Sequence, residues 1–123
     1  MSTQRIAKLN HYFDNQISLC GQRNQTLLAD DRTDEATFEK IKANVYDIFR
    51  TILSVAVETG KDDSEAVKRF FLLKAEQIPS SWEAAYQKAK RHDNAVDMRI
   101  EQIKLDTIKE IRETFTKIWE GEV

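Results

Sequence analysis

The sequence predicts an all-α protein, an up-down-up-down four-helix bundle whose third rod is kinked or broken at Pro79. Two observations lead to this fold class. The chain has only 3 Gly and 1 Pro in 123 residues, which leaves few positions for tight turns and favours a few long elements. Apolar residues recur at spacings of three and four along most of the chain, as on one face of an α-helix, and no stretch shows the alternation of a β-strand.

The composition is that of one globular domain covering residues 1–123. Hydrophobic residues make up 41% of the chain and charged residues 33%, which is too apolar for a disordered protein and too charged for a membrane span. The formal net charge of −2 does not indicate the basic domain that is typical of nucleic-acid binders. With a single cysteine and no signal-peptide pattern, we expect a cytoplasmic protein without membrane contacts.

The first two helices are expected at residues 3–28 and 34–59. The apolar stripe of the first consists of Ile6, Leu9, Phe13, Ile17, Cys20 and Leu27. The turn between the two helices is rich in Asp and Thr, which are typical of turns and helix N-caps. The predicted core stripe of the second helix consists of Phe38, Ile41, Val45, Ile48, Ile52 and Val55.

Three further helical segments are expected at residues 63–78, 81–91 and 94–119. Asp62 with Glu65, and Ser80 with Glu83, have the spacing of a capping box at the start of the third and fourth segments. The predicted core side of the third segment consists of Val67, Phe70, Leu73 and Ile78. The stripe of the last segment consists of Val96, Ile100, Ile103, Thr107, Ile111, Phe115 and Ile118.

The lengths of these segments decide the architecture. At 1.5 Å per residue, the first, second and fifth segments each measure roughly 39 Å, and the third and fourth together measure roughly 43 Å. They form four rods of nearly equal length if the third rod bends at Pro79, because proline lacks the N–H of a helix interior. Short connections make neighbouring rods antiparallel. In such a bundle Trp82 lies at the level of Gly21, and we expect Gly21 to leave room for the indole ring.

The sequence has no pattern typical of a catalytic, metal-binding or cofactor-binding site, so none of these is expected. A di-iron site in a bundle needs two Glu-x-x-His pairs, and neither His11 nor His92 follows a glutamate by three residues. Cys20 lies on the opposite side of its helix from His11 and within the apolar stripe. We therefore expect Cys20 to be a buried core residue rather than a nucleophile.

The chain has more apolar residues than the inner face of a bundle needs. Residues 52–57 and 70–73 are apolar almost all round, and the second helix carries a second stripe of Tyr46, Phe49, Leu53 and Val57. Either these positions widen the internal core, or they form an exposed belt that marks an interface. The second interpretation predicts that the chain binds itself as a homodimer, or binds a partner helix. The predicted interface residues are Tyr46, Leu53, Val57, Phe71 and Leu72.

Three hypotheses of function follow. The first is a small, non-enzymatic protein that acts through protein–protein contacts and self-associates through its second and third helices. The second is a nucleic-acid accessory protein using a basic cluster, defined as Lys88, Lys90, Arg91 and His92. This cluster also has an explanation without a ligand, because cations at the C-terminal end of a helix complement its dipole. The third hypothesis is an enzyme with an unrecognised site.

Overall fold

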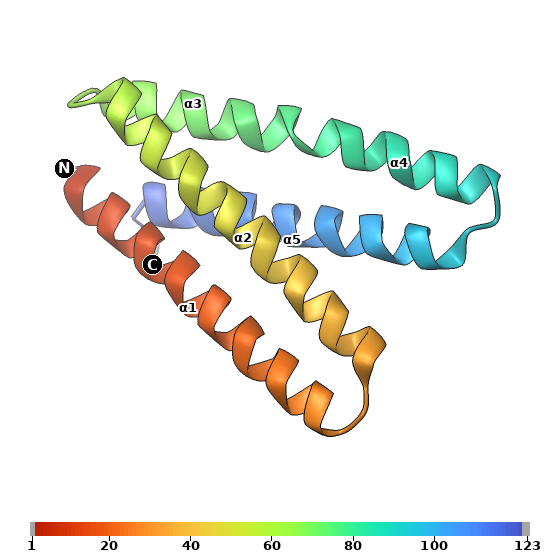
Figure 1. Cartoon of the computed structure of the whole chain (residues 1–123). Helices are drawn as coiled ribbons and strands as arrows, with labels where there is room; N and C mark the ends of the chain where they lie inside the picture. Colours follow the sequence, from red (N-terminus) through yellow and green to blue (C-terminus); the bar gives the residue numbers. More distant parts are fainter. Residues whose placement is uncertain (1, 122–123) are drawn as a thin grey trace.

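The computed structural model describes residues 2–121 and contains five helical segments. Their bounds are Ser2–Ala29 (α1), Thr33–Gly60 (α2), Ser64–Gln77 (α3), Pro79–Arg91 (α4) and Ala95–Trp119 (α5). Each bound lies within two residues of its prediction, and residues 2–121 contain no β-strand. Helices α3 and α4 form one bent rod, and each rod is antiparallel to the next (Figure 1). The predicted up-down-up-down four-helix bundle is therefore confirmed.

The third rod bends at Pro79 without losing its helical path. Ile78, which joins α3 to α4, has helical torsion angles (φ −59°, ψ −45°), and its N–H donates to the carbonyl of Lys74 (2.9 Å). Pro79 has no N–H to continue this series, so the rod bends at that residue. The Ser80 hydroxyl donates to the Gln77 carbonyl (2.7 Å), and no side chain caps α4. The predicted capping box of Ser80 and Glu83 is wrong because Ser80 already lies within the helical path.

Side chains cap the starts of α3 and α5, whereas α2, which also follows a turn, has no side-chain cap. The carboxylate of Asp63 accepts hydrogen bonds from the N–H groups of Glu65 (3.0 Å) and Ala66 (3.2 Å), so the cap of α3 lies one residue later than predicted. At the start of α5, the Asn94 side chain accepts a hydrogen bond from the N–H of Asp97 (3.1 Å). These caps stabilise the antiparallel turns by satisfying N–H groups that have no partner inside the helix.

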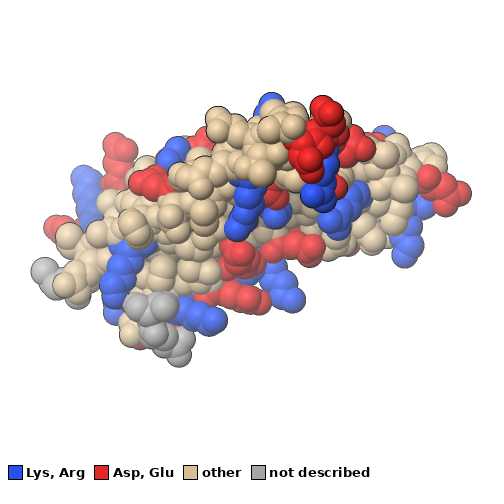
Figure 2. Space-filling model, turned by 90° about the horizontal axis from the view of Figure 1, so that it is seen from below, with Lys and Arg blue, Asp and Glu red and all other residues tan. Residues whose placement is uncertain are grey.

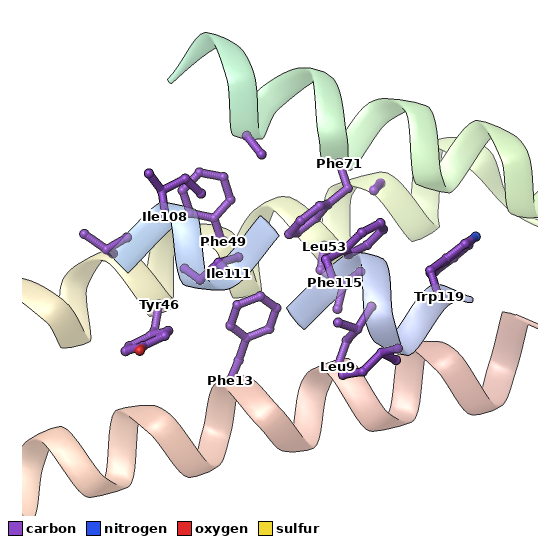
Figure 3. Close-up of a cluster of buried hydrophobic side chains, with 14 of the residues drawn as sticks. Leu9, Phe13, Tyr46, Phe49, Leu53, Phe71, Ile108, Ile111, Phe115 and Trp119 are labelled. Carbon is purple, nitrogen blue, oxygen red and sulfur yellow. The ribbon is translucent and has the colours of Figure 1, made fainter. Parts of the chain in front are cut away.

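The centre of the core is a cluster of phenylalanines contributed by every rod. Phe13, Phe49, Phe71 and Phe115 are all 0% exposed. Phe71 stacks on Phe115, with ring centroids 4.2 Å apart, and it also packs against Phe49 and Phe13 (Figure 3). Trp119 extends this stack near the end of α5. The tightest packing therefore lies in the half of the bundle that contains both chain termini (Figure 1).

Away from this core, the hairpin of α1 and α2 diverges from the hairpin formed by the bent rod and α5 (Figure 1). Helix α4 packs along α5 and makes almost no contact with α1 or α2. Gly21 is exposed, with open space where a Cβ would lie, and Trp82 packs near the ammonium group of Lys104 on α5. The expectation that Gly21 makes room for Trp82 is therefore wrong, because the hairpins have separated at this level.

The structure confirms Val45 and Ile52 of the predicted core stripe of α2, but it buries the second stripe more fully than the rest of the first. The buried apolar residues of α2 are Ala36, Val45, Tyr46, Phe49, Leu53 and Ala56. Ile48 and Val55, which belong to the predicted core stripe, are 39% and 42% exposed. Both stripes have helical spacing, so spacing alone does not choose between them. The aromatic stripe is buried because large rings remove the most apolar surface from water, and Figure 3 shows Tyr46, Phe49 and Leu53 pointing inward.

Candidate functional sites

A polar cleft of about 430 Å³ opens where the two hairpins diverge. Its lining consists of Gln16, Cys20 and Arg23 from α1, Lys42 and Tyr46 from α2, and Arg99, Ile103, Asp106, Thr107 and Glu110 from α5. Near the phenylalanine cluster the core-facing side chains are apolar, whereas most of the side chains that line the cleft are polar. Water can enter the open end of the bundle, so charged groups are tolerated there that a closed core would exclude.

A hydrogen-bonded triad ties three helices together at the inner end of the polar cleft. The Oε2 atom of Glu110 accepts one hydrogen bond from the Tyr12 hydroxyl and one from the Tyr46 hydroxyl, each 2.6 Å long. Burial, and then the bond to Glu110, raise the pKa of both phenols above their ordinary value of 10.0. Both tyrosines therefore remain protonated donors at neutral pH. The triad clamps α1 and α2 to α5.

The cations of the polar cleft are balanced by carboxylates. Glu39 is 8% exposed and forms ion pairs with Lys42 (2.9 Å) and Arg23 (3.7 Å). Its Oε1 atom is buried and accepts no hydrogen bond from the described residues. The guanidinium of Arg99 lies 5.5 Å from the centroid of the Phe38 ring. The three cations, Arg23, Lys42 and Arg99, thus lie near three carboxylates. These belong to Glu39 and to Asp106 and Glu110 of α5, so the cleft has no charge pattern that selects an anionic or a cationic ligand.

Cys20 has the surroundings of a core residue. It is 2% exposed, and burial raises the pKa of its thiol, which disfavours the reactive thiolate. His11, the nearest histidine in the sequence, lies in a different groove beside Ile118. Within residues 2–121 no three His, Cys, Asp or Glu side chains are arranged to hold a metal ion. The arrangement around Cys20 therefore offers neither a base nor a metal to activate the thiol.

The basic cluster is divided between a shallow pocket and open surface. Lys88 and His92 line a pocket of about 350 Å³ that also contains Asp97 and Glu101 of α5, two carboxylates that would repel a phosphate. The remaining two members of the cluster are exposed near the end of α4, where their charge complements the helix dipole. Acidic and basic side chains are also intermixed on the face shown in Figure 2. Nothing in this geometry favours the nucleic-acid alternative.

The predicted interface residues lie mainly inside the single chain. Leu53 and Phe71 are 0% exposed and Tyr46 is 4% exposed, while Val57 and Leu72 are half-buried against the core. Tyr46 and Leu53 on α2, and Phe71 on α3, therefore point into the core. They cannot form the exposed belt that the sequence predicted. The apolar side chains of α2 and α3 that remain exposed lie on the opposite side of these helices.

That opposite side is uncharged over most of α2. Uncharged side chains recur at spacings of three and four from Ile41 to Thr59, passing through Asn44, Ile48, Thr51 and Val55. Arg50, on the other flank of α2, forms an ion pair with Asp14 of α1 (2.7 Å), so Ile48 and Val55 lie on the flank toward α3. Leu73 of α3, the helix that packs beside α2, is also exposed (50%). We define the outer face as Asn44, Ile48, Thr51, Val55 and Leu73.

No protein-family model, curated protein or solved structure matches this chain in comparisons of its sequence and fold. The site must therefore be argued from the residues themselves. Within residues 2–121 no helix combines the length and the apolar character that are needed to cross a bilayer.

Proposed function

We propose that this protein is a non-enzymatic interaction module that self-associates through the outer face of α2 and α3. The observation that carries this proposal is the exposure of Ile48 and Val55 (39% and 42%) on a charge-free strip of α2, beside which Leu73 of α3 is 50% exposed between the charged Arg69 and Glu76. In a chain with 33% charged residues, such a surface is unusual on the outside of a helix. Contiguous exposed apolar surface is typical of a protein–protein contact.

The size of the apolar contribution sets the expected affinity. Each of the three side chains is about half exposed, and complete burial of such a side chain stabilises by roughly 1.5–3 kcal/mol, so covering the rest contributes about 1 kcal/mol. A symmetric pair covers six such side chains and gains about 6 kcal/mol, which is close to the lower estimates for the cost of association. A micromolar dissociation constant corresponds to a net free energy of about 8 kcal/mol, so these six side chains alone do not reach it, and a dimer of that strength requires further favourable contacts across the interface.

The other sites support a non-enzymatic role for the chain. In the polar cleft the two tyrosines that contact Glu110 are held as protonated donors, and the lining cations are matched by carboxylates. Cys20 is buried without a base. These groups join helices to one another, whereas the outer face has exposed apolar side chains that no other part of the described chain covers.

The proposal is tested by placing a charge on the outer face. The variant Val55→Asp puts a carboxylate in the middle of the face, and Val96→Asp changes a residue that is 66% exposed on α5, away from the face. Sedimentation equilibrium at tens of micromolar should show a dimer for the wild type and for Val96→Asp, and a monomer for Val55→Asp. Circular dichroism should show the same helix content in all three. A wild-type monomer, or a dimer that survives Val55→Asp, would contradict the proposal.

A further inference from the structure

Two charges on α2 indicate how the two copies are arranged. Resting on the proposed function, we infer that the outer faces pair with the two α2 helices antiparallel, across a two-fold axis at the level of Phe49. This arrangement brings Lys40 of each copy beside the partner's Glu58. The pairing of these charges, rather than the apolar side chains, sets the direction and register of the contact.

Lys40 and Glu58 occupy equivalent places at the two ends of the outer face. They are eighteen residues apart, which is five full helical turns, so both side chains point in the same direction from the axis of α2. This direction is about 60° around the helix from the middle of the outer face. Both are exposed, and neither forms an ion pair with another residue of the described chain. Each therefore has a free charge at the edge of the uncharged surface.

Symmetry brings these two charges together in only one of the two directions. Lys40 is nine residues before Phe49 and Glu58 is nine residues after it. An antiparallel pair centred on Phe49 therefore places each Lys40 at the height of the partner's Glu58, on the same side of the contact, and forms two ion pairs. A parallel pair places each Lys40 at the height of the partner's Lys40, on the opposite side of the contact, and forms neither ion pair.

The contribution of α3 fits the same axis. The ring of Phe71 packs against that of Phe49, with centroids 5.9 Å apart, so the two residues lie at nearly the same height. Leu73 follows Phe71 by two residues and lies about 3 Å further along α3. Leu73 therefore lies at nearly the height of the proposed two-fold axis.

Charge reversal tests the arrangement. Lys40→Glu and Glu58→Lys each turn two attractions into two repulsions, and each should weaken the dimer by roughly tenfold at low salt. The double variant, Lys40→Glu with Glu58→Lys, restores two opposite-charge pairs and should return the wild-type dissociation constant. An equimolar mixture of the two single variants should form a heterodimer that is tighter than either homodimer. Lys90→Glu on α4 makes the same change in net charge as Lys40→Glu and should have no effect.

The outcomes separate this inference from the proposed function. If Val55→Asp disperses the dimer but the single charge reversals leave its dissociation constant unchanged, the arrangement is wrong and self-association stands. Loss of affinity in both single variants without recovery in the double variant also contradicts the arrangement. If the wild type is a monomer, both proposals fall. Circular dichroism on each variant shows whether a loss of affinity comes from unfolding instead.

Discussion

The exchange of the two stripes on α2 can be tested by truncating one residue from each. Leu53 belongs to the stripe that faces the core and is 0% exposed, whereas Ile48 belongs to the opposite stripe and is 39% exposed. The substitutions Leu53→Ala and Ile48→Ala remove side chains of the same size from the same helix, five residues apart. The two variants differ mainly in whether the removed atoms were buried in the core or partly exposed to solvent.

The structure predicts a large difference in stability between these variants. Truncating a fully buried leucine removes its transfer free energy and leaves a cavity, which together cost about 2–5 kcal/mol. Ile48 loses only a partly buried side chain, worth about 1 kcal/mol, and alanine regains a few tenths of this through its higher helix propensity. We therefore expect Leu53→Ala to lower the free energy of unfolding by at least about 2 kcal/mol more than Ile48→Ala.

The assay is urea denaturation followed by circular dichroism, at a protein concentration low enough for the chain to be monomeric. This condition matters because a dimer would itself bury Ile48 and add to the measured cost of its truncation. Equal losses of stability in the two variants, or a larger loss for Ile48→Ala, would refute the assignment of the inner and outer stripes.

Three further predictions concern individual groups. Burial, and then the bond to Glu110, raise the pKa of Tyr46, so stability should fall as the pH rises above about 10, where tyrosines of the unfolded chain ionise. Tyr46→Phe should reduce this alkaline loss in urea titrations, and an unchanged pH profile would show that the burial of Tyr46 beside Glu110 does not contribute to it. Cys20 should react with a thiol reagent only as fast as the chain unfolds, whereas rapid labelling under native conditions would contradict its burial. Asp63→Ala should lower the free energy of unfolding by about 1 kcal/mol, and the uncapped neighbour Asp62→Ala should change it by less than about 0.5 kcal/mol; equal effects would contradict the cap geometry.

Much of the fold could be predicted because its signals are local. Helical spacing, few glycines and one proline led to the correct segments, the equal rod lengths led to four rods, and the short connections led to the correct antiparallel order. The sequence left open whether the aromatic stripe of α2 is buried, because apolar spacing fits both stripes equally well. The deciding factor is long-range: Phe49 packs among rings from three other rods, and Tyr46 reaches Glu110 on α5. Such contacts depend on tertiary packing that the α2 segment alone does not contain.

The polar cleft was missed for a related reason. Arg23, Lys42 and Arg99 lie near the apolar stripes of their helices and would be expected on the wet side of a closed bundle. They face one another only because the hairpins diverge, and this divergence depends on how α4 packs against α5 alone. The outer face was found only after the structure had shown which apolar residues remain exposed.

Cysteine cross-linking gives the most direct test of self-association through the outer face. In the antiparallel arrangement the two copies of residue 48 lie about 3 Å apart along the helix axes, whereas the two copies of residue 55 lie about 18 Å apart. Under mild oxidation, Ile48→Cys should form a covalent dimer and Val55→Cys should not. The wild type, whose one cysteine is the buried Cys20, should remain uncross-linked. Absence of a covalent dimer with Ile48→Cys, or cross-linking that is equally fast with Val55→Cys, would contradict the account.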